Sequence, residues 1–161
     1  MTTAGFFVRG GVSIGQLYMD ENIVFGPALI DAYAAEQSHA RDPRIVLTPA
    51  AVSAVKRHLT YYARPHDAPQ TREFFLDSDG QCFINYLEAI VPEVDGPDLR
   101  TLRRHKRQVQ KMLRRYRTRP PIWSKYAWVA GYHNFFCRQQ HCPEQLFIDL
   151  SKYQMTPSLI A

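Results

Sequence analysis

The turn-forming run Asp95-Gly96-Pro97 divides this 161-residue chain into two parts with different sequence patterns. Before it, short apolar runs alternate with turn residues, which is typical of short strands and helices joined by turns. After it, apolar residues recur at helical spacing over long stretches. We therefore predict an α+β fold. A small antiparallel or mixed sheet with packed helices should occupy residues 1–95, and a C-terminal helical pair and tail should occupy residues 98–161.

The first part carries two hairpin signals and two helix signals. The paired glycines Gly10 and Gly11 lie inside an apolar, β-branched run, where they indicate a bulge or a close approach of another backbone. Proline after Gly26 and after Thr48 marks two helix starts. The predicted elements begin with a strand at 6–14, a hairpin of 16–19 and 23–25 around Asp20-Glu21-Asn22, and a helix from Gly26-Pro27 to about Ala40. A buried strand from Arg44 to Leu47, a helix from Thr48-Pro49 to about Ala63 and a loop at 64–71 follow. The last two are the strands Phe74 to Leu76 and Cys82 to Leu87, which flank the turn Asp77-Ser78-Asp79-Gly80.

The pattern of the second part predicts two helices. Residues 98–117 repeat apolar residues at helical spacing, and Arg119-Pro120-Pro121 ends that helix. Residues 122–138 are apolar around most of their helical surface, so this helix should be buried or covered by a partner. The tail from Pro143 is weakly patterned.

Charge is concentrated in the first of these helices. The chain carries a net charge of +5, yet residues 98–119 hold ten of its twenty lysines and arginines and a single acid, Asp98. Such a segment can bind the phosphates of DNA or RNA, meet anionic lipid, face solvent, or dock onto the acidic remainder of the same chain or of a second copy. We prefer the solvated or docked interpretation to nucleic-acid binding. The candidate contact residues are Arg103, Arg104, Lys106, Arg107, Lys111, Arg114 and Arg115.

Several features predict a cytoplasmic protein without a membrane partner. The three cysteines form no framework spacing, which favours free thiols in a reducing compartment. The longest apolar runs fall well short of the ~20 residues that cross a bilayer. The N-terminus has no basic region followed by an apolar stretch, so we predict no signal peptide.

The runs "RGGVSIG", "FGPALIDAYAAE" and "PRIVLTP" occur in order, with a short hairpin between the first two. Over residues 6–50 this pattern resembles the second half of a class III nucleotidyl cyclase catalytic domain. The run "KYAWVAGYHNFF" resembles, more weakly, a tail of bacterial cyclase-like proteins. The resemblance implies a partial cyclase-like fold, and association of two chains, because class III cyclases form their active sites at a dimer interface.

The resemblance also implies that catalytic groups are missing. The family's two metal-binding aspartates precede the R-x-G-I strand, which begins here at residue 6. Its base-reading residue and its transition-state Asn and Arg correspond to Ile23, Ile30 and Ala34. None of these can carry charge or donate a side-chain hydrogen bond, and losing one preorganised donor typically costs roughly 2.7–4 kcal/mol. The abrupt start predicts that Met1 is an internal methionine of a longer ancestral reading frame.

Three other constellations could carry chemistry. Asp20-Glu21 and Asp77/Asp79 could bind a metal, but their places in hairpin turns favour backbone roles. The residues of a conceivable zinc site, His133, Cys137, His141 and Cys142, do not have a common ligand spacing. Ser13 lies in a G-x-S-x-G sequence, but the following hairpin replaces the strand-to-helix turn that a nucleophile elbow needs. We assign no catalytic residue, metal ligand or cofactor.

We therefore predict a non-catalytic, truncated cyclase-like protein that acts by self-association or by pairing with a complete cyclase-like partner. A sheet edge left open by the missing half should make the purified chain dimerise or aggregate. The first alternative is a nucleic-acid-binding protein that uses the basic helix. The second is a residual cyclase completed in trans.

Overall fold

The computed structural model describes residues 7–91 and 96–153, which form two compact units, one of Phe7–Ala89 and one beginning at Ile90. The fold is α+β, as predicted: a small mixed sheet with packed helices and, later in the chain, a helical pair. Phe6 of the predicted first strand, Asp95 of the predicted turn and residues 154–161 of the tail lie outside the described residues.

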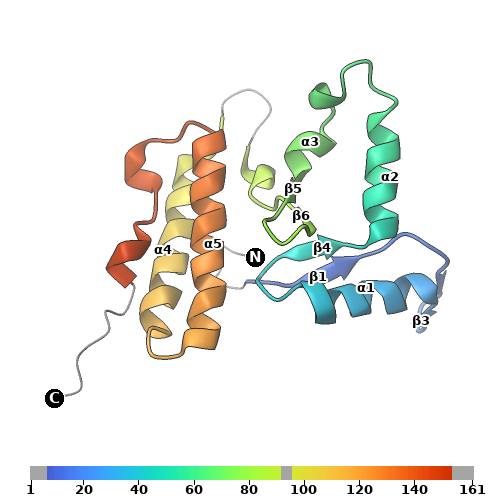
Figure 1. Ribbon diagram of the computed structural model, residues 1–161, viewed down its shortest axis with the longest axis horizontal. Helices are drawn as coiled ribbons and strands as arrows, with labels where there is room; N and C mark the ends of the chain where they lie inside the picture. Colours follow the sequence, from blue (N-terminus) through green and yellow to red (C-terminus); the bar gives the residue numbers. More distant parts are fainter. Residues whose placement is uncertain (1–6, 92–95, 154–161) are drawn as a thin grey trace. The chain divides into compact units, whose positions relative to one another are not determined.

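The sheet of the first unit has four short strands in the order β1-β4-β6-β5 (Figure 1). β1 and β4 run parallel, with Gly11 opposite Val46, and the other neighbours are antiparallel. A parallel pair needs a long crossover, which the chain supplies with a hairpin and α1 between the two strands. The strands are β1 Gly10–Val12, β4 Ile45–Leu47, β5 Phe74–Leu76 and β6 Cys82–Ile84.

Helix α1, Pro27–His39, packs directly on β1 because both contact surfaces are small. A Cβ atom added to Gly11 would lie 2.1 Å from the backbone oxygen of Ala32. The helix buries Ala28 and Ala35. The glycine pair therefore marks a close helix–strand approach, which confirms one of the two roles predicted for it.

The predicted hairpin consists of β2, Tyr18–Met19, and β3, Val24–Phe25. It joins α1 through Gly26, whose φ of 144° lies in a region that residues with a Cβ rarely adopt. There is also no room for a side chain, since a Cβ on Gly26 would lie 2.7 Å from the Gln16 backbone oxygen. The same oxygen accepts a hydrogen bond from the Ala28 N–H at 3.2 Å, which joins the base of the hairpin to the first turn of the helix.

Helix α2, Pro49–Leu59, begins as predicted, with the Thr48 hydroxyl accepting a hydrogen bond from the Ala51 N–H at 3.3 Å. Its end lies before the predicted Ala63, because the next residues form tight turns, including Thr60 N–H to the Arg57 oxygen at 3.1 Å. The predicted loop at 64–71 is partly helical. It contains a 3₁₀ turn at Pro65–Asp67 and the start of the short helix α3, Gln70–Glu73.

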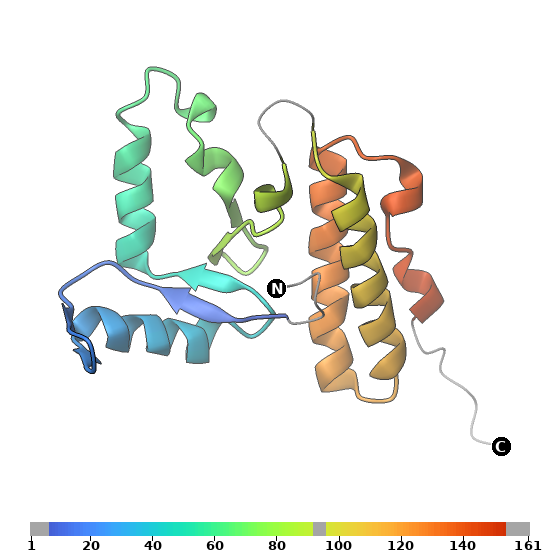
Figure 2. The ribbon, with the colours of Figure 1, turned by 180° about the vertical axis from the view of Figure 1, so that it is seen from behind.

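The second unit is built on two helices joined by a short turn, α4 Leu99–Arg115 and α5 Pro120–Gln139, which lie side by side in Figures 1 and 2. Asp98 caps α4 by accepting hydrogen bonds from the Arg100 and Thr101 N–H groups. The tail adds 3₁₀ turns at Glu144–Leu146 and Leu150–Tyr153. The fully buried apolar core of this unit includes Leu102, Val109, Leu113, Val129, Phe136 and Leu146.

Candidate association surface and basic helix face

Large apolar side chains are exposed along one continuous stretch of the first unit. Residues 14–33 contain ten of the fourteen exposed large hydrophobic residues found among the described residues. We call this set the hairpin–α1 face. It consists of Ile14, Leu17, Tyr18, Met19, Ile23, Val24, Phe25, Leu29, Ile30 and Tyr33.

The local structure explains why these side chains stay outside. Side chains alternate across a strand pair, yet both sides of the β2–β3 hairpin are exposed. The Tyr18 and Phe25 rings pack on each other at 4.9 Å on one side of it. In α1 the small residues face β1, so Leu29, Ile30 and Tyr33 point to solvent. The hairpin–α1 face thus consists of the exposed hairpin and the solvent side of α1, whose opposite side packs on β1 through alanine.

The three positions that matter for the cyclase resemblance lie on or beside this face. Ile23 and Ile30 are exposed members of it. Ala34 lines an open hollow of about 400 Å³ between α1 and the start of α2. An adjoining hollow of about 290 Å³ shares Thr48 and His39 with it. Among the residues that the structure describes, Asp31 is the only carboxylate that lines either hollow, so these residues do not offer the pair of carboxylates that two metal ions would need.

Asp20 has a backbone role in the hairpin turn, as preferred above. Its Oδ1 accepts hydrogen bonds from the N–H groups of Asn22 at 2.9 Å and Ile23 at 2.8 Å. Its Oδ2 accepts one from the Tyr18 hydroxyl at 2.9 Å. These backbone and hydroxyl donors lower the pKa of the Asp20 carboxyl. The carboxylate is therefore already used to close the turn.

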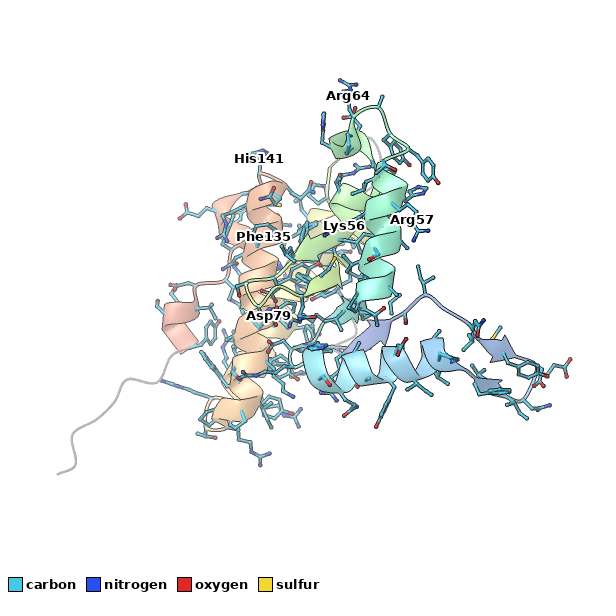
Figure 3. All side chains as sticks on the ribbon, turned by 45° about the vertical axis from the view of Figure 1, so that its right-hand side comes forward. Lys56, Arg57, Arg64, Asp79, Phe135 and His141 are labelled. Atoms are coloured by element: carbon cyan, nitrogen blue, oxygen red, sulfur yellow. The ribbon has the colours of Figure 1, made fainter. Side chains whose placement is uncertain are left out.

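Asp77 and Asp79 have a different partner, which the sequence analysis missed. Both carboxylates bind the guanidinium of Arg44, a side chain only 1% exposed at the start of β4. Arg44 also donates to the His39 backbone oxygen at 3.0 Å, and its hydrogen bond to Asp79 lowers the pKa of that carboxyl. A buried charge needs paired partners, and the D-x-D spacing of the β5–β6 turn, where Figure 3 labels Asp79, supplies them.

Ser13 follows β1 and accepts a hydrogen bond from the Thr48 hydroxyl at 3.2 Å. The chain then continues into the hairpin and not into a helix. The geometry of a nucleophile elbow is absent at this residue.

Two histidines form the polar centre of the helical pair. The Nδ1 atoms of His105 and His133 lie 2.9 Å apart, and the His133 Nε2 is 2.9 Å from the Leu146 backbone oxygen. A carbonyl only accepts, so Nε2 of His133 carries the proton and its Nδ1 accepts one from His105. Burial, with a smaller contribution from the neighbouring ring, lowers the pKa of His105 to about 3. His105 lies at helical spacing from Leu102, Val109 and Leu113, and this spacing is the sequence feature from which its burial could have been predicted.

The conceivable zinc site does not assemble. His133 uses Nε2 on Leu146, and burial raises the pKa of the Cys137 thiol to about 12, so neither is ready to bind a metal. His141 is exposed at the end of α5, as Figure 3 shows. Across residues 7–91 and 96–153, no three His, Cys, Asp or Glu side chains are grouped so that they could hold a metal ion.

The basic residues of α4 gather on one exposed face. Helical geometry places them opposite Leu102, Val109 and Leu113, which are fully buried. Lys106 lies at the edge of this arrangement and donates to the Gln145 backbone oxygen at 2.8 Å. Arg114 contacts Tyr153, with 3.4 Å from Nη2 to the hydroxyl. The structure therefore places six of the seven predicted contact residues, Arg103, Arg104, Arg107, Lys111, Arg114 and Arg115, on the exposed side of α4, and it leaves Lys106 half-buried at the edge of that side.

No helix within the described residues is long and apolar enough to span a membrane. Comparison of the chain with protein-family models, with curated proteins and with solved structures gives no match.

Proposed function

We propose that this chain is a non-catalytic cyclase-like module that acts by self-association through the hairpin–α1 face. The observation that carries the proposal is the set of ten exposed large apolar side chains within residues 14–33. Soluble monomers rarely expose a contiguous apolar patch of more than a few hundred Å². Covering these side chains with a partner would remove that surface from water.

The size of the face is compatible with a stable dimer. At roughly 80 Å² for each half-exposed large side chain, the ten carry on the order of 800 Å² of exposed surface, comparable with the area that each partner buries in a standard interface. Because Tyr18 and Met19 point to opposite sides of the hairpin, a partner has to contact both sides of it to cover all ten. The composition of the face is also suitable, since apolar and aromatic side chains dominate the buried centre of such interfaces.

A second copy is the partner that the face fits best. In the part of the chain that the structure describes, β2 and β3 pair only with each other, and a two-stranded ribbon is marginally stable alone. Each strand therefore has one unpaired edge, to which the same strand of a second copy can hydrogen-bond. Two hairpins joined in this way form a closed dimer with two-fold symmetry. An antiparallel arrangement would also separate the acidic tips at Asp20 and Glu21. The resemblance to class III cyclases, which dimerise, supports the same partner.

The absence of polar groups at Ile23, Ile30 and Ala34 supports a non-catalytic role. In the resembled family these positions would hold the base and stabilise the transition state. A face built from isoleucine and alanine at these positions favours packing over charge stabilisation.

Sedimentation or light scattering over a range of protein concentrations tests self-association. We expect a reversible monomer–dimer equilibrium for the unmodified chain and a monomer for the double variant Met19→Glu/Ile30→Glu. These side chains are 71% and 66% exposed, so the changes should leave the fold intact. The matched control is Tyr61→Glu/Leu76→Glu, at side chains 77% and 75% exposed outside the hairpin–α1 face. It should still dimerise.

A chain that stays monomeric at high concentration, or a control that loses dimerisation equally, would contradict this interface. The non-catalytic part is tested separately, by incubation with each of the four nucleoside triphosphates and Mg²⁺ or Mn²⁺. We expect no cyclic nucleotide. Formation of one that depends on the folded chain would refute that part and leave the association result in place.

A further inference from the structure

We propose that the exposed face of α4 is a nucleic-acid-binding surface that holds the phosphates of a DNA or RNA backbone. This binding activity is independent of self-association through the hairpin–α1 face, which lies in the other unit. Five observations support it: the alignment of the charges, the lack of acidic partners, a cationic hollow, the absence of an exposed apolar flank and the predominance of arginine.

Seven positive side chains of α4 share one side of the helix. At about 100° per residue they fall within an arc of roughly 120°, and at 1.5 Å per residue they extend over about 22 Å of the axis. An array of this length spans several phosphates of a nucleic-acid strand. Its members are Arg100, Arg103, Arg104, Arg107, Lys111, Arg114 and Arg115, all of them exposed.

Acidic side chains do not neutralise this array within its own unit. Residues 96–153 contain thirteen lysines and arginines and three acids, Asp98, Glu144 and Asp149. Asp98 caps the helix, and Asp149 pairs with Lys152 at 3.5 Å. Within this described range, no ion pair joins a base of α4 to a carboxylate. The array therefore keeps its positive potential. A nucleic acid that binds the array releases the counterions condensed on its own phosphates, and this release favours binding.

A hollow of about 350 Å³ lies at the N-terminal half of the array. Arg103, Lys106 and Arg107 line it together with Gln110 and Gln145. Two arginines and one lysine thus line one concave spot, where the Gln145 carbonyl holds Lys106 in place. Guanidinium binds phosphate oxygens in pairs, and glutamine side chains can add hydrogen bonds to phosphate, sugar or base. The hollow is the position at which we expect one phosphate to be held most firmly.

The same face does not suit a lipid surface. A helix that lies in a membrane interface inserts an exposed apolar side beneath its charges. Leu102, Val109 and Leu113 of α4 are fully buried in its own unit, and the remaining apolar residues, Leu99 and Met112, are half-buried, so the helix has no exposed apolar side to insert. Eight of the ten bases in residues 98–119 are arginine, which recognises phosphate through a planar pair of donors. The chemistry of the face therefore fits a nucleic-acid backbone better than a bilayer.

Fluorescence anisotropy with the full chain tests the proposal. The probes are a labelled DNA duplex of about 20 base pairs, a single-stranded RNA of about the same length, and vesicles containing phosphatidylserine, each measured between about 50 and 200 mM salt. We expect at least one nucleic acid to bind, with an affinity that falls by about 10³ (single strand) to 10⁴ (duplex) over that range, as for proteins that contact about seven phosphates. The tighter nucleic acid identifies the natural class of ligand.

The test variant is Arg103→Gln/Arg107→Gln/Lys111→Gln, which removes three exposed charges and keeps residues that favour helices. At about 100 mM salt we expect at least a tenfold loss of affinity and a log–log salt slope smaller by about 3. The matched control, Arg41→Gln/Lys56→Gln/Arg57→Gln, removes the same three charges from exposed positions in the other unit, two of them labelled on α2 in Figure 3. It should change the affinity less than about threefold.

Far-UV circular dichroism of each variant verifies that its helices are retained. The proposal is overturned if neither nucleic acid binds at low salt, if affinity barely changes with salt, or if the control loses as much affinity as the test variant. It is also overturned if the vesicles bind more tightly than either nucleic acid and only vesicle binding depends on the three α4 residues.

Discussion

Helices α1 and α4 use apolar residues in opposite ways. In α1 the buried positions are alanines, Ala28 and Ala35, whereas Leu29, Ile30 and Tyr33 face solvent. In α4 the buried positions are Leu102, His105, Val109 and Leu113, and the solvent side is nearly all arginine and lysine. Each helix contains large apolar side chains, but only α4 buries them within its own unit.

The difference indicates what each unit can bind. A helix that already buries its large side chains has nothing apolar to offer a partner, so its outer side can interact only through charge. A helix that packs on its sheet through alanine leaves its large side chains for another molecule. This contrast is the basis for proposing protein association for the first unit and polyanion binding for the second.

The largest expected difference between the two helices is the effect of deleting one leucine side chain. Leu102 is 0% exposed and Leu29 is 45% exposed. We expect Leu102→Ala to lower the free energy of unfolding by about 3–5 kcal/mol, because it leaves a cavity. Leu29→Ala should lower it by under about 1 kcal/mol in the monomer. Urea unfolding followed by circular dichroism at low protein concentration measures both, and equal losses would show that α1 buries its leucine as α4 does.

The two units should also differ in how their stability responds when a methyl group is added to one glycine. At Gly11 the new Cβ would lie 2.1 Å from the Ala32 oxygen, so β1 and α1 must move apart. We expect Gly11→Ala to cost about 1–3 kcal/mol. The control is Gly131→Ala in α5, where no atom beyond the adjoining residues and backbone of the same helix lies within 4 Å of the new Cβ, and alanine should stabilise the helix by about 1 kcal/mol. Thermal unfolding that ranks the two variants the other way would refute the close packing of α1 on β1.

Mild acid should destabilise the helical pair selectively. His105 takes up a proton in the unfolded chain near its ordinary pKa of 6.5, but in the folded chain only near about 3. The unfolded state therefore binds the proton first, and stability that is complete above pH 6.5 declines toward pH 3. We expect a loss of about 2 kcal/mol by pH 5 from this group. Fluorescence follows this unit alone, because Trp123 and Trp128 both lie in α5.

The control for the acid effect is His66→Gln, at an exposed histidine outside the pair. This variant should show the same decline between pH 6.5 and 5. A fluorescence-detected stability that stays constant over that interval in the unmodified chain would mean that the imidazole pair accepts a proton without cost.

The smallest expected effect concerns how helices begin in the two units. Thr48 caps α2 through its hydroxyl, and we expect Thr48→Ala to cost about 1 kcal/mol. Thr118, exposed just before the uncapped start of α5, is the matched control, and Thr118→Ala should change stability by under about 0.5 kcal/mol. Equal effects in urea unfolding would argue against the cap.

Local features of the fold were predictable because their causes are local. The Asp20-Glu21-Asn22 turn, the Thr48 cap and the proline starts of the helices depend on residues within a few positions of one another. The end of α2 was predicted too late, because backbone bonds close most of the turns after Leu59 and leave no mark on residue type. The side-chain bond there, from the Thr60 hydroxyl to the Arg57 oxygen at 2.7 Å, is one that a threonine inside a helix can also make.

Long-range pairs were not predictable in the same way. The partners of Arg44 lie 33 and 35 residues further along the chain, and its neighbours Ile45 to Leu47 indicated only a buried strand. The seven candidate residues of α4 were found from charge alone. The position of Lys106 at the edge of their face, and the hollow that Lys106 lines with Gln145, required the fold, since Gln145 comes from the tail.

The imidazole pair at the centre of the helical unit has a consequence for alignment. If α4 slid along α5 by one turn, Thr101 or Val109 would stand opposite His133 in place of His105. Val109 has no polar atom to meet the His133 Nδ1, and a buried nitrogen without a donor is costly. A single buried polar contact thus rejects the shift that would place Val109 opposite His133, which leucine and valine alone would tolerate, as a buried asparagine does in a coiled coil. The arginines of α4 belong to the same helix as His105. The alignment of α4 with α5 therefore also fixes the position of each arginine along the helix axis relative to Gln145, the tail residue that lines the cationic hollow.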